Sequence, residues 1–163
     1  MRISIVTAVI ALDLLIGSAG QARSGSIAEM PLAASEGKWE LRVGKDKFSD
    51  ENSCVTIPKG NPHVQVNLGK LFVSYRGRGG VQSYRIRLDD GPPSALRLAS
   101  SVERKAGHVL LGGSVFERIL MARRLRVQAL TTRSGVVVDD LDLSGMAALY
   151  KRMQSICGGK GTP

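Results

Sequence analysis

The sequence contains few of the side chains on which nucleic-acid binding and most catalysis depend. Its 163 residues include two histidines and two cysteines, and aromatic residues make up 4%. So few aromatic rings leave little for single-stranded nucleic acid to stack on, and we do not expect nucleic acid as a partner. The histidines, His63 and His108, each stand at the start of a predicted strand. We expect them at surface or edge positions and not beside a nucleophile as a catalytic base.

Signatures of metal binding and of catalysis are also scarce. The cysteines lie far apart, so no zinc-binding spacing exists, and no Gly-x-Ser-x-Gly elbow is present. Asp89 and Asp90 form a pair of carboxylates without a third ligand at calcium-loop spacing, and the Gly91–Pro93 segment beside them indicates a turn. We expect no metal, no cofactor and no enzymatic activity, and an unrecognised hydrolase is the third-ranked hypothesis.

Long hydrophobic runs are missing except at the beginning of the chain. Arg2 precedes an apolar run to Ile16, and small residues follow as far as Ala22. This three-part plan predicts a signal peptide at 1–22. A membrane anchor is the alternative, but the run is short and Asp13 interrupts it, so cleavage is favoured. No later segment could span a membrane, and a periplasmic or secreted location is expected.

Charge of one sign dominates: the formal net charge is +9. Removal of residues 1–22 takes away Arg2 and Asp13 together, so the mature chain is equally basic. A basic domain favours anionic partners, although the charge could serve solubility alone. We divide the mature chain into a flexible lead-in at 23–37, a single β-rich domain at 38–157 and a disordered tail at 158–163.

The two cysteines, Cys54 and Cys157, lie near opposite ends of this domain. In an exported protein they most simply form one disulfide. A closed loop of about 100 residues would stabilise the fold by at most about 4–5 kcal/mol on a chain-entropy model. The alternative is two free buried thiols.

Alternating apolar residues and turn signals predict many short strands. The Arg76–Gly80 segment resembles a phosphate-binding loop, but strand-like residues follow it, so a hairpin turn is the better interpretation. In the next strand we expect Tyr84, Ile86 and Leu88 to face one way and Ser83, Arg85 and Arg87 the other. The predicted strands are Trp39–Val43, Cys54–Ile57, His63–Leu68, Leu71–Tyr75, Val81–Leu88, Leu96–Leu98, His108–Leu111, Leu125–Leu130 and Val136–Asp139.

Two segments have helical signals. Ser114 and Glu117 have the spacing of a capping box and open a predicted short helix that ends near Ala122. Ser144 is a good N-cap for a last helix, whose apolar stripe is Met146, Leu149, Tyr150, Met153 and Cys157. The predicted fold class is α+β and mainly antiparallel, a sandwich or strongly bent sheet with a short internal helix and a C-terminal helix packed on the sheet.

Arginines alternate with apolar residues on several predicted strands. If these strands are neighbours, the outward sides merge into an anion- or partner-binding patch, because guanidinium groups suit phosphate and carboxylate. A merely solvated sheet face is the alternative. The candidate residues are Arg85, Arg87, Arg97, Arg124 and Arg126.

The order of segments in the second half is distinctive. It runs through Tyr84–Arg87, Asp89–Pro93, Phe116–Ala122, Leu125–Val127 and Asp142–Leu149 to Cys157. This order resembles that of small exported proteobacterial proteins, the invasion-associated locus B group and the periplasmic proteins associated with type VI secretion. These share a β-rich domain, an early cysteine after a polar turn, and a Ser-Gly-x-x-Ala-Leu helix that ends at a cysteine. The resemblance covers roughly residues 39–157 and implies an envelope accessory or host-interaction protein.

Two binding functions follow from these observations. The first is a non-enzymatic envelope protein that engages a protein or an anionic surface polymer through the basic sheet face. The second is a secreted inhibitor of a host or competitor enzyme, whose target would have to be acidic. Salt separates the two, because surface electrostatics fade at high ionic strength and a packed interface persists. The sequence does not predict an oligomeric state.

Overall fold

A computed structural model describes residues 27–158. The predicted signal peptide at 1–22 lies outside the described residues, as does the predicted tail from residue 159 onward. The described part is a mixed α+β fold with mainly antiparallel sheets and a C-terminal helix packed on one of them, as the sequence predicted.

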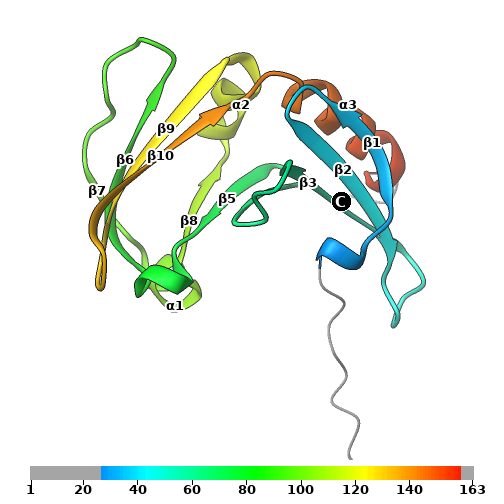
Figure 1. Cartoon of the computed structure of the whole chain (residues 1–163), viewed down its shortest axis with the longest axis horizontal. Helices are drawn as coiled ribbons and strands as arrows, with labels where there is room; N and C mark the ends of the chain where they lie inside the picture. Colours follow the sequence, from blue (N-terminus) through cyan, green and yellow to red (C-terminus); the bar gives the residue numbers. More distant parts are fainter. Residues whose placement is uncertain (1–26, 159–163) are drawn as a thin grey trace, which may run out of the picture.

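The ten described strands form two sheets that splay apart and do not close into a barrel (Figure 1). The larger sheet contains, in spatial order, β1 (Leu32–Glu36), β2 (Trp39–Lys45), β3 (Asn52–Pro58), β4 (Val64–Asn67), β5 (Lys70–Ser74) and β8 (His108–Gly112). The smaller sheet contains β10 (Gly135–Asp142), β9 (Arg124–Thr131), β6 (Val81–Leu88) and β7 (Arg97–Leu98). The helical elements are η1 (Ile27–Glu29), η2 (Arg76–Arg78), α1 (Ser101–Ala106), α2 (Ser114–Met121) and α3 (Met146–Cys157).

The predicted apolar stripe buries α3 against the larger sheet. Met146, Leu149, Tyr150 and Met153 are buried, and the helix packs on β1, β2 and β3. At its end Cys157 forms a disulfide with Cys54 of β3, the pairing expected from the sequence, with a Cα–Cα distance of 6.2 Å. The first strands and the last helix of the described chain are therefore joined both by packing and covalently.

Trp39 fastens the two sheets together from within the core. It is fully buried, and its Nε1 donates a hydrogen bond of 2.8 Å to the carbonyl oxygen of Asp142 at the end of β10. Nearby, the rings of Phe116 in α2 and Tyr150 in α3 meet edge to face at 5.1 Å, a preferred aromatic geometry. Trp39 thus serves as a core anchor.

Helix α1 was not predicted, and a capping box is found at its start and not at the start of α2, where one was predicted. The Ser100 side chain accepts from the Glu103 amide, and the Glu103 carboxylate accepts from the Ser100 amide. At the predicted box, Gly113 is the N-cap of α2 and Ser114 is already the first helical residue. Because the N-cap must be the residue before the helix, Ser114 cannot cap it.

Helix α3, in contrast, begins one residue later than expected. Gly145 is its N-cap, with a φ of 92°, and no side chain caps the helix. Ser144 is instead held by Asp142, whose Oδ1 accepts its amide hydrogen at 2.9 Å. The cap prediction at Ser144 was therefore wrong, because the carboxylate two residues earlier takes the amide of Ser144 into a local turn.

Two predicted connections have different structures. Residues 23–37 were expected to be a flexible lead-in, yet within them β1 pairs with β2 in an antiparallel ladder. The Arg76–Gly80 segment was expected to turn a hairpin, but β5 and β6 belong to different sheets. The short helix η2 carries the chain from one sheet to the other instead, which local sequence does not distinguish from a hairpin.

Candidate functional site

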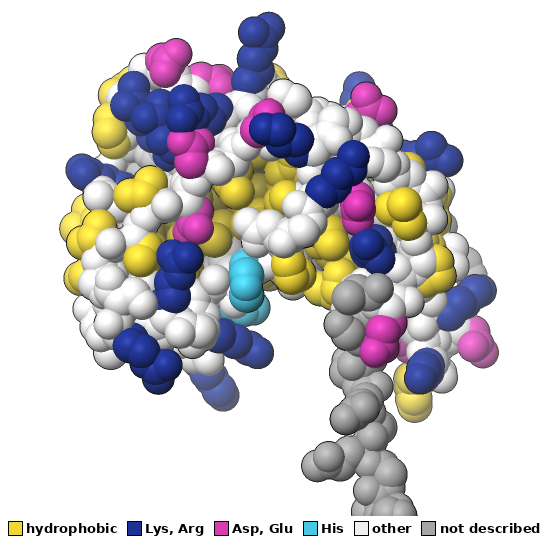
Figure 2. Space-filling view, in the orientation of Figure 1, with side chains coloured by type: hydrophobic (Ala, Val, Ile, Leu, Met, Phe, Trp, Pro, Cys, Tyr) yellow, Lys and Arg dark blue, Asp and Glu magenta, His cyan; other side chains and the backbone are white. Residues whose placement is uncertain are grey.

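The outer face of the smaller sheet gathers most of the predicted arginines. Alternation along β6 sends Tyr84 and Ile86 into the core and leaves Arg85 and Arg87 on the outside. The antiparallel register then places Arg87 directly opposite Arg126 of β9 and Arg85 opposite Gln128. Figure 2 shows Lys and Arg side chains gathered over the end of this sheet, at the upper left, with acidic side chains among them.

Three of the five candidate arginines surround one shallow hollow. Arg85, Arg87 and Arg126 line a space of about 180 Å³ together with Gln128 and with apolar atoms of Pro93 and Val138. Gln128 was not predicted as part of this site, although its two-residue spacing from Arg126 places it on the same strand face. It could not place Pro93 or Val138, because neither belongs to an arginine-bearing strand.

Neutral oxygen atoms orient the guanidinium groups of Arg85 and Arg87. The Arg85 Nε donates to Oε1 of Gln128. The Arg87 Nε donates to the carbonyl oxygen of Gly91 at 2.7 Å, and a terminal nitrogen donates to that of Asp90 at 3.2 Å. Neither arginine has a carboxylate within ion-pair distance among residues 27–158. Both positive charges are thus held in place without being neutralised.

Arg126 is bound more loosely to the same turn. Its guanidinium donates to the Asp89 carbonyl oxygen at 3.2 Å and lies 3.6 Å from Oδ1 of Asp90, whose side chain is almost fully exposed. An exposed ion pair of this length neutralises little charge. The Arg126 Nε is buried and has no hydrogen-bond partner in the described part of the chain.

Asp89 builds the turn that supplies these carbonyl oxygens. Its Oδ1 accepts the amide hydrogens of Arg123 and Arg124, each at 2.9 Å, and its φ is 48°. Aspartate tolerates this left-handed conformation better than most residues because its short side chain bonds nearby backbone groups. The predicted turn at Asp89–Pro93 is confirmed, and Asp89 ties it to the start of β9.

The other two candidate arginines are placed differently. Arg124 lies on the same face but forms a two-point ion pair with Asp140 of β10, and its hydrogen bonds lower the pKa of that carboxyl group. Arg97 of β7 lies opposite Tyr84, so it belongs to the inward side, where its guanidinium stacks 5.6 Å from the centre of the Tyr84 ring. The expectation that all five arginines share one face was therefore wrong for Arg97.

Exposed apolar side chains continue the outer face beyond the arginines. Leu98 and Leu130 both lie in register with Ser83, and Val136 lies opposite Leu130. Leu98, Val136 and the neighbouring Val138 are each more than half exposed. The outer face, as we name this surface, therefore has a cationic end and an apolar end.

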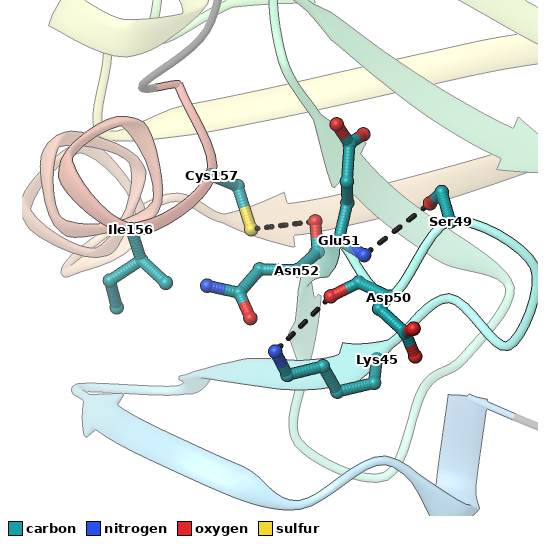
Figure 3. Close-up of a pocket in the computed structure, with 7 residues that line it drawn as sticks. All are labelled: Lys45, Ser49, Asp50, Glu51, Asn52, Ile156 and Cys157. Carbon is teal, nitrogen blue, oxygen red and sulfur yellow. Dashed lines mark hydrogen bonds between the residues drawn. The ribbon is translucent and has the colours of Figure 1, made fainter.

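A larger hollow of about 510 Å³ lies beside the disulfide, between the β2–β3 loop and the end of α3 (Figure 3). Lys45 donates to the Asp50 carbonyl oxygen at 3.1 Å, and Glu51 and Asn52 line the same wall. The Cys157 sulfur lies 3.4 Å from the Asn52 carbonyl oxygen, but a disulfide sulfur has no proton to donate. This hollow therefore offers no thiol nucleophile.

The remaining reactive groups are not arranged as a metal centre. Residues 27–158 contain no group of three or more His, Cys, Asp or Glu that could hold a metal ion. Burial, together with the charge of Arg76, lowers the pKa of His108 in β8. No helix within this range is long and apolar enough to cross a membrane.

Comparison with protein-family models, with curated proteins and with solved structures gives no match.

Proposed function

We propose that this protein is an exported, non-enzymatic binding protein whose outer face docks an acidic partner protein or an anionic surface polymer. The observation that carries the proposal is the hollow shared by Arg85, Arg87 and Arg126. Two of these guanidinium groups are oriented by neutral oxygens, so their charge is available to a partner. Oriented guanidinium groups bind carboxylate and phosphate with two-point geometry.

The apolar end of the outer face favours a protein as the partner. Leu98, Leu130 and Val136 adjoin the arginines, and an anionic polymer would leave these side chains in water. Protein interfaces combine a desolvated apolar centre with arginine, which is enriched there relative to other charged residues. An acidic protein patch with an apolar neighbour would match both ends.

Export is supported by the N-terminal segment and by the disulfide. Arg2, the apolar run and the small residues before Arg23 have the plan of a signal peptide, and disulfides form in oxidising compartments. A periplasmic or secreted location belongs to the proposal, as does membership of the exported proteobacterial group that the second half of the sequence resembles.

The test is a comparison of immobilised proteins exposed to cell-envelope extract at low and at high salt. We expect the double variant Arg85→Glu/Arg87→Glu to lose the retained partner, with affinity lowered at least about tenfold at low salt. Lys151→Glu/Arg152→Glu is the matched control. It reverses the same amount of charge on exposed residues of α3, which packs on the other sheet.

Equal loss in both double variants would show that net charge alone attracts the partner, and it would refute a specific site. Retention by both variants would refute the role of the outer face. The inhibitor function is a second candidate, favoured by the apolar end of the face. It predicts that one discrete enzyme stays bound at high salt, because a packed interface is screened less than exposed charges.

A further inference from the structure

A separate hollow of about 300 Å³ opens where the two sheets fail to close. The space-filling view shows a depression between the two halves of the molecule, with hydrophobic side chains visible deep inside it (Figure 2). The polar lining of the 300 Å³ hollow comes from both sheets and their connections: Asn61, His63, Ser74, Arg78 and Asp139. Its apolar lining includes Val64 and Val73, which lie opposite each other on β4 and β5.

The side chain of Asp139 faces this hollow and is fixed by a hydrogen bond from Tyr75. On β10 it alternates with the exposed Val138 and Asp140 and lies opposite the buried Val127, so its side chain faces inward. The hydroxyl group of Tyr75 donates to its Oδ2 at 2.6 Å. Burial and this bond raise the pKa of Tyr75, so the phenol stays a neutral donor. Oδ1 of Asp139 has no hydrogen-bond partner within residues 27–158 and stays available.

Arg78 supplies the opposite charge on the same wall. Its amide donates to the Tyr75 carbonyl oxygen at 2.9 Å, and its own carbonyl oxygen accepts from the Arg133 amide at 3.1 Å, so its backbone is fixed on both sides. Its side chain is exposed and lines the hollow together with Asp139. Even so, no ion pair joins Arg78 to Asp139 in the described chain.

A hollow lined by a guanidinium group and a carboxylate that do not pair with each other discriminates among ligand classes. A simple anion near Arg78 would face the carboxylate of Asp139, and a simple cation would face the guanidinium. A molecule with an ammonium group and a carboxylate satisfies both charges. The space is at the small end of the range of ligand pockets, which suits a compact ligand.

We propose that this hollow is a binding site for a small zwitterion, a free amino acid or a dipeptide. Asp139 receives the ammonium group through Oδ1, and Arg78 receives the carboxylate. Asn61, His63 and Ser74 surround the remaining atoms and select among side chains. The site is independent of the outer face, because neighbouring residues of β10 point to opposite sides of the sheet.

The experiment is calorimetric titration of the oxidised protein, expressed from its full chain, with the free amino acids and with a set of dipeptides. We expect one class to bind more tightly than about 1 mM. The N-acetyl derivative of the bound compound lacks the ammonium group and its amide derivative lacks the carboxylate, and each should bind at least about tenfold more weakly. Comparison of the two panels distinguishes a free amino acid from a dipeptide.

Two variants test the assigned residues. Asp139→Asn keeps an acceptor for Tyr75, so it should fold, bind the parent compound at least about tenfold more weakly and leave binding of the N-acetyl derivative unchanged. Arg78→Gln should do the same with respect to the amide derivative. Glu117→Gln and Arg118→Gln remove the same charges from exposed positions of α2 and should leave the affinity unchanged.

The proposal is overturned if no compound of either panel binds more tightly than about 10 mM. It is also overturned if the parent compound binds folded Asp139→Asn and Arg78→Gln as tightly as it binds the unaltered protein. Blocked derivatives that bind as well as their parents would likewise exclude a zwitterion site.

Discussion

The hydroxyl group of Tyr84 donates a hydrogen bond of 2.8 Å to the carboxylate of Glu103, a residue with only 4% of its surface exposed. The same carboxylate accepts the amide hydrogens of Ser100, at 2.8 Å, and of Leu110, at 3.0 Å. One buried acid thus joins α1 to a strand of each sheet. Three donors compensate for its desolvation, as a buried carboxylate requires.

Glu103→Gln should therefore lower the free energy of unfolding at pH 7 by about 1–3 kcal/mol, because the new amide group cannot accept all three bonds. Burial raises the pKa of Glu103, but the bonds from Ser100, Leu110 and Tyr84 outweigh it, so the pKa is lowered overall. The stabilisation is then present above the unfolded pKa and is lost as the pH falls through the folded value. Urea unfolding at pH 7 and at low pH checks this, and an equal difference at both pH values would contradict it.

Gly145 should tolerate no side chain. A Cβ atom there would lie 2.4 Å from the Glu36 carbonyl oxygen, and the φ of 92° is itself strained for other residues. We expect Gly145→Ala to lose more than about 4 kcal/mol or to fail to fold. Gly135→Ala is the control, because Gly135 has a φ of 64° but no atom within 4 Å of the new Cβ. It should cost about 1–2 kcal/mol, and similar thermal midpoints for the two variants would refute the clash.

Asp142 should stabilise the fold at all pH values except in strong acid. Hydrogen bonds from Ser144, followed by that from Lys38, lower the pKa of Asp142 to about 2. Because the folded pKa lies below the ordinary value near 3.9, the contribution is complete above that value and is lost as the pH falls through about 2. Asp142→Asn should therefore lower the thermal midpoint at pH 7, and the difference from the unaltered protein should shrink below the ordinary pKa and vanish once the pH is below about 2. A difference that grows on acidification would contradict the assignment.

The disulfide should be a major source of stability. It joins cysteines 103 positions apart, for which the chain-entropy model gives at most about 4–5 kcal/mol. Fluorescence of the single tryptophan, Trp39, reports urea unfolding with and without a reducing agent. We expect reduction to lower the midpoint of the unaltered protein and to leave Cys54→Ser/Cys157→Ser unchanged, since that variant has no bond to reduce. An effect on both would point to something other than this disulfide.

Local patterns predicted nine of the ten described strands and the last helix because their burial follows simple periods, whereas β1 (Leu32–Glu36) was missed. Alternation placed Ile86 inside and Arg85 outside, and the stripe from Met146 to Met153 identified the buried face of α3. The position of Arg97 depends on register instead: β7 is two residues long and pairs Arg97 with Tyr84. Nothing near Arg97 in the sequence specifies that pairing, so its inward side could not be deduced.

Helix α1 was predictable in part. Ser100 and Glu103 have the spacing of a capping box, but the segment between them and Gly107 is too short and too charged to show an apolar period. The burial of Glu103 depends on Tyr84, which lies 19 residues earlier. The hollow around Asp139 could not be predicted, because Tyr75 and Asp139 come together only through the packing of two sheets.

Helix α3 is the last described element of the chain, yet it covers the strands made first. β3 ends at Pro58 and α3 begins at Met146, so more than eighty residues separate them. When the chain emerges N-terminus first from the ribosome or from a translocation channel, β1, β2 and β3 therefore appear well before the helix that packs on them. The hydrogen bond from Trp39 to the Asp142 carbonyl oxygen likewise cannot form until Asp142 has been synthesised. The face of the larger sheet on which α3 packs therefore stays uncovered until the last described helix has been made, and only then can Cys157 reach Cys54.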